Sequence, residues 1–287
     1  MMLEEFAPAK VNLALHVTGQ RSDGYHLLDS LVMFASVGDH LVFTPANELS
    51  LSVDGPEAHA VPIEDNSILR AARLLDAAKT ARIHLTKALP VASGIGGGTA
   101  DAAAAYRGLA KLWDLPEPTP TAQTFDHVAN LGADVPACLF SRAARMSGIG
   151  EQIEFLPGLP ELNAVLVNPR SEVPTPTVFK AIAFKDNPPM DTMPSNFANQ
   201  AAFVTWLGLQ RNDMQDAAIS IAPAITEVLS AIAPTTRCQL ARMSGSGATC
   251  FGLFPDAQTA QNAASQISET HPDWWVQPCI LGGDAAS

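Results

Sequence analysis

Charged residues are scarce in this sequence of 287 residues, at 16% against the roughly 25% that is typical of globular domains. Basic residues are the scarcer kind, because 17 Lys and Arg stand against 29 Asp and Glu and leave a net charge of −12. We therefore expect neither a nucleic acid nor an anionic membrane surface as a partner. The 47% of apolar residues excludes an intrinsically disordered chain. An acidic chain can still form a basic pocket, so an anionic small molecule remains open as a substrate.

Cysteines are too few to crosslink a chain of this length, and they form no C-x-x-C pair. The four, with the spacing of the histidines, match no zinc site, so we predict no metal site built from protein side chains. The first residues lack the basic and apolar regions of a signal peptide, and no run of about 18 apolar residues is free of charges and breakers. These absences predict a cytoplasmic globular protein of enzyme size.

Hydrophobic periodicity predicts strands and helices along the first half of the chain. Apolar and polar residues alternate over 11–18, which predicts a half-buried strand. The Asp23-Gly24 pair is a hairpin signal, and the apolar segments 27–37 and 41–43 continue the strands beyond it. The spacing then predicts helices at 67–79, 100–113 and 123–131, with a short strand at 82–89.

A cluster of breakers at 156–160 separates two apolar parts of the chain. We place a domain boundary there, with an N-terminal domain over 1–158 and a C-terminal domain over 159–287. The second part predicts a proline-rich loop at 186–195, helices at 196–207 and 212–232, strands on either side of 244–247, a helix and a last strand through 276. This mixture predicts an α/β (α+β) fold with partly antiparallel sheets.

A glycine-rich segment at 93–99 stands between the strand at 82–89 and the helix at 100–113. A glycine loop that opens a helix directs free backbone N–H groups and the positive helix end to one point, which favours a phosphate. No Lys-Ser or Lys-Thr follows Gly98, so the segment is not a Walker A motif. The dinucleotide fingerprint fails as well, because its third glycine would fall at Thr99. A flexible connection stays open as an alternative, although such linkers rarely run straight into a strong helix.

Single polar residues elsewhere have ordinary explanations when each is taken alone. Asp134 has the sequence position of a turn or N-cap carboxylate, and Lys10 precedes a strand as many solvated lysines do. Tyr25 and His26 follow a turn, where a lone histidine is usually structural or exposed. Their occurrence together and in order is what points to a function.

The segments 8–13 (PAKVNL) and 21–26 (RSDGYH) closely resemble the opening of the bacterial 4-diphosphocytidyl-2-C-methyl-D-erythritol kinases, a family of the GHMP kinase superfamily. Segment 90–102 is similar to the ATP loop of that family, and this loop is shared across the superfamily. The series continues with 132–136 (GADVP), 148–151, 174–179, 212–213 and 244–248. The resemblance runs from residue 6 to about residue 255.

The resemblance implies a two-domain fold, with an N-terminal domain like ribosomal protein S5 domain 2 and a ferredoxin-like C-terminal domain. It also implies transfer of the γ-phosphoryl group of ATP, with Mg²⁺, to the 2-hydroxyl of 4-diphosphocytidyl-2-C-methyl-D-erythritol, a step in the non-mevalonate route to isoprenoids. A small-molecule partner is thus expected, and a weak homodimer is left open.

The resemblance further assigns a role to individual positions. Asp134 is implied as the catalytic base and Lys10 as its cationic partner. The ATP loop is implied to consist of Pro90, Val91, Ala92, Ser93, Gly94, Ile95, Gly96, Gly97, Gly98, Thr99 and Ala100. The residues implied to bind the cytidyl substrate are Asn12, Tyr25, His26, Thr175, Phe179, Gly245, Ser246 and Gly247. Tyr25 and Phe179 would stack on the base, and His26 would bond its edge.

The sequence departs from the family pattern at a few positions. Ser93 stands where many members have glycine, and Thr99 and Ala100 stand where they have serines. Met214 and Gln215 replace a leucine and an acidic residue that often follow Asn-Asp.

Two other functions fit parts of this pattern. Another GHMP kinase, acting on homoserine, mevalonate or a sugar, would not need Tyr-His after the turn. A non-catalytic nucleotide sensor would be expected to have lost the lysine or the aspartate of the catalytic pair, and this chain has both.

Overall fold

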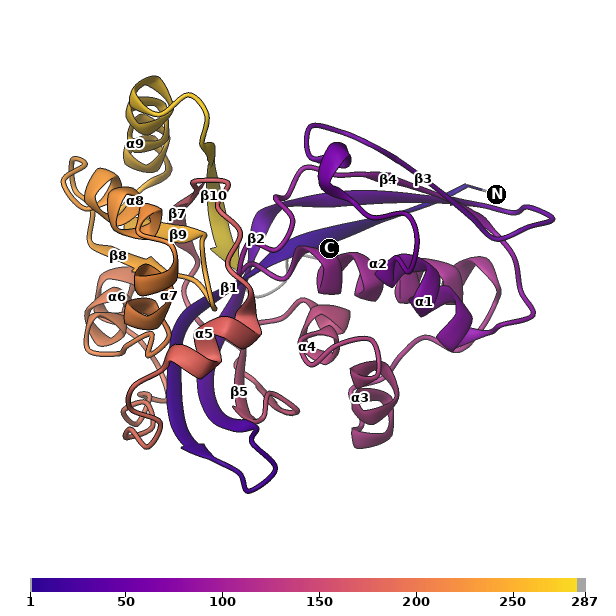
Figure 1. Ribbon diagram of the computed structural model, residues 1–287, viewed down its shortest axis with the longest axis horizontal. Helices are drawn as coiled ribbons and strands as arrows, with labels where there is room; N and C mark the ends of the chain where they lie inside the picture. The colour runs from indigo at the N-terminus through magenta and orange to yellow at the C-terminus, as the bar shows by residue number, and fades with distance from the viewer. Residues whose placement is uncertain (1, 283–287) are drawn as a thin grey trace.

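Two long strands, β1 (Leu3–Gln20) and β2 (His26–Thr44), form a hairpin that runs through the middle of the molecule (Figure 1). The computed structural model describes residues 2–282. The antiparallel register of the hairpin shifts at three points along β1, between Pro8 and Lys10, between Asn12 and Ala14, and again near its end. Such bulges bend a strand and increase its twist. The hairpin is therefore curved and contributes to both halves of the chain.

Residues 7–17 of β1 are all buried, so the prediction of a half-buried strand is wrong. The reason lies in the tertiary packing, because β1 passes through three hydrophobic clusters in succession. Ala7 belongs to the cluster under the N-terminal helices, Val11 to the cluster between the halves and Val17 to the cluster of the C-terminal half. Local alternation cannot show that a second layer covers the polar side of the pattern.

The other strands extend the hairpin into one mixed sheet with the strand order β3-β4-β2-β10-β7-β9-β8. β10 connects the halves, because Leu281 and Gly282 pair with Ala35 and Phe34 of β2 while 275–281 pair with β7. β5 also pairs with β2, and β6 pairs with β5. These strands are β3 (Ser50–Asp54), β4 (Arg82–Thr86), β5 (Ala144–Gly148), β6 (Gln152–Phe155), β7 (Leu162–Asn168), β8 (Leu240–Met243), β9 (Cys250–Phe254) and β10 (Trp275–Gly282).

The helices form two groups, one for each half. Figure 1 shows α1 and α2 side by side against the N-terminal part of the sheet, with α4 and α3 beyond them, and α6 to α9 around the C-terminal strands. The N-terminal group is α1 (Ser67–Leu75), α2 (Gly97–Leu112), α3 (Ala122–Ala129) and α4 (Val135–Phe140), with a short 3-10 helix at Ala58–Ala60. The second group is α5 (Thr175–Ala181), α6 (Gln200–Gly208), α7 (Gln215–Ile221), α8 (Ala224–Ile232) and α9 (Ala257–Thr270).

Several predicted elements differ from the structure in their limits, and three of the differences have a clear physical reason. The helix expected at 67–79 ends at Leu75, because Asp76 leaves the helical conformation and its side chain accepts the N–H of Ala78. The helix expected at 212–232 is divided into α7 and α8 at Pro223, which cannot donate a helical hydrogen bond. The last strand, expected to end at 276, runs to Gly282 through its pairing with β2.

His16 links the hairpin to the C-terminal half through hydrogen bonds. Its ring is 1% exposed; Nε2 accepts the backbone N–H of Arg211 at 2.9 Å, and Nδ1 lies 3.1 Å from the carbonyl of Pro188. Because Nε2 accepts, the neutral ring donates from Nδ1 to that carbonyl. Burial lowers the pKa of His16 below its ordinary 6.5, since the charged ring would lose its water.

We expect this histidine to make the protein less stable in mild acid. With its pKa lowered in the folded state, the folded protein binds fewer protons than the unfolded chain as the pH falls through 6.5, so stability is lost in that direction. Denaturant unfolding at about pH 7.5 and about pH 5.5 should show a larger loss in the wild type than in a His16→Gln variant. Equal losses in the two proteins would contradict this role.

Candidate active site

A buried lysine and a half-exposed aspartate meet at the centre of the molecule. The side chain of Lys10, on β1, is 3% exposed, and its Nζ lies 3.2 Å from Oδ1 of Asp134, whose side chain is 41% exposed. Asp134 does occupy the N-cap position of α4, but its side chain makes no capping hydrogen bond. Its carboxylate is thus held by the ammonium instead of by the helix, with one side open to solvent.

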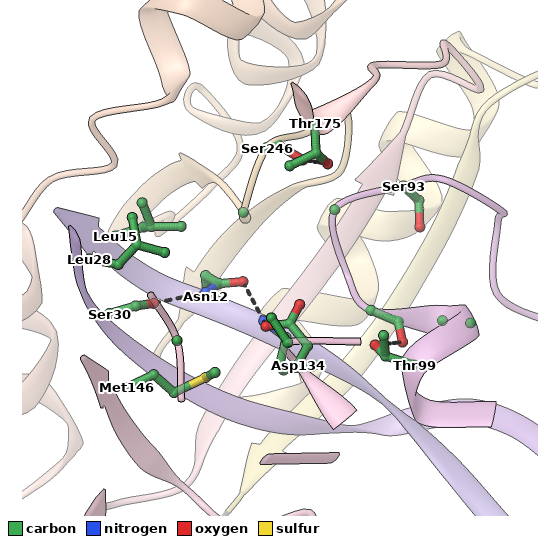
Figure 2. Close-up of a pocket in the computed structure, with 18 of the residues that line it drawn as sticks. Asn12, Leu15, Leu28, Ser30, Ser93, Thr99, Asp134, Met146, Thr175 and Ser246 are labelled. Atoms are coloured by element: carbon green, nitrogen blue, oxygen red, sulfur yellow. Dashed lines mark hydrogen bonds and ion pairs between the residues drawn. The ribbon is translucent and has the colours of Figure 1, made fainter. Parts of the chain in front are cut away.

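A polar chain along the hairpin orients the lysine. Nζ of Lys10 donates to Oδ1 of Asn12 at 3.0 Å, and Nδ2 of Asn12 donates to Oγ of Ser30 at 2.8 Å. Ser30 in turn donates to the carbonyl of Ala14 at 2.8 Å. Figure 2 shows Asn12 between Ser30 and Asp134. Because each member has a defined donor or acceptor role, the amide of Asn12 is fixed with its oxygen toward Lys10.

The predicted glycine loop leads directly into α2. Gly94 and Gly96 have φ angles of 75° and 66°, in the left-handed region that favours glycine, and Gly96 is the N-cap of the helix. A Cβ on Gly96 would lie 3.1 Å from Oγ1 of Thr99 and 3.3 Å from Cβ of Lys10. A side chain at this position would crowd the lysine and strain the left-handed backbone, so glycine is favoured here. The first N–H groups of the 16-residue helix have no acceptor within it, which makes this end suited to an anion.

A second loop, at 244–247, packs against the first one. Oγ of Ser244 accepts the N–H of Asn12 and donates to the carbonyl of Gly94, both at 3.0 Å. Asn212 fixes the same loop, because its Nδ2 donates to the carbonyls of Met243 and of Gly245, at 2.8 and 2.9 Å. The glycine loop is thus held from the C-terminal half.

A cavity of about 520 Å³ lies between these two loops and the hairpin. Figure 2 shows its apolar side, with Leu15, Leu28 and Met146, and its polar side, with Thr175 and Ser246, whose hydroxyl oxygens are 2.8 Å apart. The sequence-predicted residues on its wall are Lys10, Asn12, Ala92, Ser93, Gly94, Gly96, Gly97, Gly98, Thr99, Asp134, Thr175, Phe179, Gly245 and Ser246. The remaining predicted residues, Pro90, Val91, Ile95, Ala100, Tyr25, His26 and Gly247, lie outside this wall.

Of the three ring-bearing residues predicted to bind the cytidyl base, His26 and Phe179 lie together in the structure and Tyr25 lies apart from them. His26 stacks on Phe179, with ring centroids 4.8 Å apart and planes at 19°. Nε2 of His26 is buried and has no partner among the described residues, and burial lowers the pKa of this histidine, with Lys185 nearby adding to the effect. Tyr25, by contrast, is 60% exposed on the turn of the hairpin.

Arg70 is a residue of the wall that the sequence motifs do not indicate. It lies on α1 and lines the cavity beside Ser67 and the glycine loop. Its nearest acidic neighbour, Asp65, is 3.8 Å away and 81% exposed, which makes a weak pair. The charged residues of the wall are thus Arg70 and Lys10 against Asp134, so a strongly acidic chain has a cavity with an excess of positive charge.

Two family models match this chain. The GHMP kinase N-terminal domain matches residues 66–142, and the GHMP kinase C-terminal domain matches residues 198–273. A protein of Roseobacter denitrificans named 4-diphosphocytidyl-2-C-methyl-D-erythritol kinase is 54% identical over 99% of this chain and 95% of its own length. A protein of the same name from Cereibacter sphaeroides is 54% identical over 98% of this chain and its own full length.

Solved structures agree with these matches. The crystal structure of a 4-(cytidine 5'-diphospho)-2C-methyl-D-erythritol kinase has a TM-score of 0.78 and 31% identity, and the match covers 98% of this chain and 100% of the other. A homoserine kinase from Cytophaga hutchinsonii, at 17% identity and a TM-score of 0.68 over 99% and 96% of the two chains, shares the fold. The predicted two-domain fold of the GHMP kinases is confirmed. Within residues 2–282, no helix is long and apolar enough to cross a membrane.

Proposed function

This chain belongs to the 4-diphosphocytidyl-2-C-methyl-D-erythritol kinases of the GHMP kinase family, and on that premise we propose that it transfers the γ-phosphoryl group of ATP to the 2-hydroxyl of 4-diphosphocytidyl-2-C-methyl-D-erythritol. One observation carries the proposal. The paired Lys10 and Asp134 face the same cavity as the glycine loop at the start of α2. A base and a phosphate site are thus next to each other, as transfer to an alcohol requires. The reaction belongs to the non-mevalonate route to isoprenoid precursors.

Asp134 acts as the general base for the hydroxyl of the substrate. Its carboxylate is on the cavity wall and has no hydrogen bond to the helix it precedes, so an oxygen is free to accept the proton. Lys10 holds that carboxylate in position by attraction at 3.2 Å, and its charge offsets the negative charge that develops on the reacting oxygens. The nucleophile is a crowded tertiary alcohol, so orientation contributes more than base strength.

The phosphates of ATP lie against the glycine loop and the first turn of α2. Backbone N–H groups at the helix end supply hydrogen bonds, and Arg70 and Lys10 supply positive charge from two sides of the cavity. Mg²⁺ enters with ATP as part of the substrate. Residues 2–282 contain no group of three or more His, Cys, Asp or Glu that could hold an ion. Mg²⁺ keeps waters and phosphates as its main ligands and needs no dedicated cage of protein side chains.

The cytidyl end of the substrate is placed near Phe179, whose ring is on the cavity wall. His26 stacks on that ring from outside the cavity wall and its Nε2 is buried, so the edge contact predicted for it requires the imidazole to turn toward a base that enters here. Tyr25, at the exposed turn of the hairpin, would supply the second aromatic face. Asn12 and Thr175 line the stretch toward Asp134, where the polyol would lie.

ADP release against a panel of alcohols tests the substrate assignment. With Mg²⁺ and ATP present, we expect turnover with 4-diphosphocytidyl-2-C-methyl-D-erythritol and none with homoserine, mevalonate or galactose, because only the first offers a base for Phe179 and His26. Turnover with another alcohol instead would remove the base-recognition argument. ATP binding without turnover on any of the four would favour a nucleotide sensor.

Asp134→Asn should separate catalysis from binding. The amide keeps the shape of the side chain but cannot take the proton, so we expect kcat to fall by about 10²- to 10⁴-fold, the usual contribution of general acid–base catalysis. KM for ATP should change little, because the glycine loop is intact. Steady-state kinetics on the purified variant measure both. A kcat near that of the wild type would exclude the base role.

Arg70→Met should weaken ATP binding through the loss of a charge near the phosphates. We expect KM for ATP to rise by about tenfold and kcat to stay close to that of the wild type. Arg73→Met is the matched control, because Arg73 is an exposed arginine of the same helix and does not line the cavity. A comparable rise in KM for the two variants would show that only the general charge of α1 matters.

A further inference from the structure

Three titratable side chains form a buried cluster beside the glycine loop and take no part in the proposed chemistry. Nζ of Lys87 donates to Oδ2 of Asp39 and to Oδ2 of Asp101, at 2.6 Å each. The side chains of the three are 2%, 0% and 5% exposed, and none lines the cavity of the candidate active site. Taking such groups out of water is costly, and burial raises the pKa of Asp101 to about 8; an apolar cluster of the same size often stabilises a protein as well or better. Stability alone therefore does not explain why titratable side chains, and not apolar ones, occupy these three positions.

The cluster holds the chain where it enters the loop. Lys87 directly follows β4, and Oδ1 of Asp39 accepts the N–H groups of the next two residues, Ala88 at 2.6 Å and Leu89 at 2.9 Å. Pro90, the first residue of the predicted ATP loop, comes immediately after them. One carboxylate on β2 thus fixes the direction in which the chain leaves β4.

The same cluster holds the chain where it leaves the loop. Asp101 is on α2, four residues after Gly97, and therefore on the same side of the helix. The ammonium of Lys87 lies directly against the start of that helix, because a Cβ on Gly97 would be only 3.2 Å from its Nζ. Lys87 thus joins the strand before the loop to the helix after it.

We propose that Asp39, Lys87 and Asp101 are positioning residues for the nucleotide: they fix both ends of the 90–100 loop so that its N–H groups are in place before ATP binds. The inference rests on the proposed function in that it takes this loop as the ATP site. Directed hydrogen bonds at 2.6 to 2.9 Å define the position of a backbone more narrowly than apolar contacts do. A loop already held in its binding geometry loses less entropy when it takes up the phosphates.

Oδ1 of Asp101 supports a role beyond stability. It is buried without any hydrogen-bond partner among the described residues. A buried polar atom in that state costs free energy, and a network selected for stability alone would be expected to satisfy it. We explain this cost by the other oxygen of the same carboxylate. Oδ2 of Asp101 accepts the hydrogen bond of Lys87 and so fixes the position of α2 relative to the strand before the loop.

Asp39→Ala and Asp101→Ala test the proposal, because each variant leaves Lys87 paired with the other carboxylate and so avoids an isolated buried charge. ATP affinity is measured by calorimetry without the alcohol substrate. We expect the Kd for ATP to rise by about tenfold in both variants, since a misplaced loop weakens every phosphate contact together. In the kinetic assay, KM for the cytidyl substrate should stay within about twofold of the wild type.

Glu5→Ala is the matched control. Glu5, whose side chain is 8% exposed, joins β1 to α2 through Arg107 at 2.9 Å and Lys111 at 2.7 Å, away from the loop. Its loss should reduce thermal stability and leave the Kd for ATP unchanged. If the Asp39 and Asp101 variants lose stability and also keep the wild-type Kd, the cluster is only structural and the proposal is wrong.

Two further measurements keep the outcome decisive. If an alanine variant does not fold, Asp101→Leu keeps roughly the size of the side chain but cannot accept the hydrogen bond of Lys87, and an unchanged Kd for ATP in that variant would overturn the proposal. Because the binding experiment uses ATP alone, a wild type that binds ATP but does not phosphorylate the cytidyl substrate would refute the proposed function and leave this inference testable. A wild type that does not bind ATP would overturn both.

Discussion

The ion pair between Lys10 and Asp134 is the interaction on which the arrangement of the site depends. An ammonium that is 3% exposed needs partners, because an unpaired charge in the interior costs several kcal/mol. Among residues 2–282 the acceptors of that ammonium are Oδ1 of Asn12 and the carboxylate of Asp134. Register shifts lie on either side of Lys10 and Asn12 in β1, where bulges bend the strand, and the side chains of both residues line the cavity. The Lys10–Asp134 pair thus forms at a bent part of the hairpin.

The glycine loop depends on both halves of the chain. The N–H of Thr249 donates to the carbonyl of Ser93 at 3.1 Å, and Nε1 of Trp275 donates to the carbonyl of Ala88 at 3.0 Å. From the other side, the buried cluster around Lys87 holds the ends of the loop. The domain boundary near residue 158 stays a prediction, and the sheet continues across it through the pairing of β10 with β2. Under the proposed function, a loop held in this way would lose less entropy when it binds the phosphates of ATP.

The sequence indicated the glycine loop and the Lys-Asp pair because each lies in a short segment with a recognisable motif. It did not indicate Arg70, Ser30 or the partners of Lys87, since these meet the site only through the packing of α1 and the register of the hairpin. Ser30, for example, pairs with Leu15 across the hairpin and reaches Asn12 from there. The limits of β1 and β10 escaped prediction for the same reason, because burial on a second face and pairing with β2 are long-range effects.

A double-mutant cycle between Lys10 and Asp134 tests most directly whether the pair acts as one catalytic unit. Single-turnover phosphoryl transfer would be measured for the wild type, Lys10→Met, Asp134→Asn and the double variant, at saturating ATP. If the two residues act as one unit, the double variant should be about as slow as the slower single variant. Losses that multiply in the double variant would show that Lys10 and Asp134 act independently, and would contradict the dependence of the site on their ion pair.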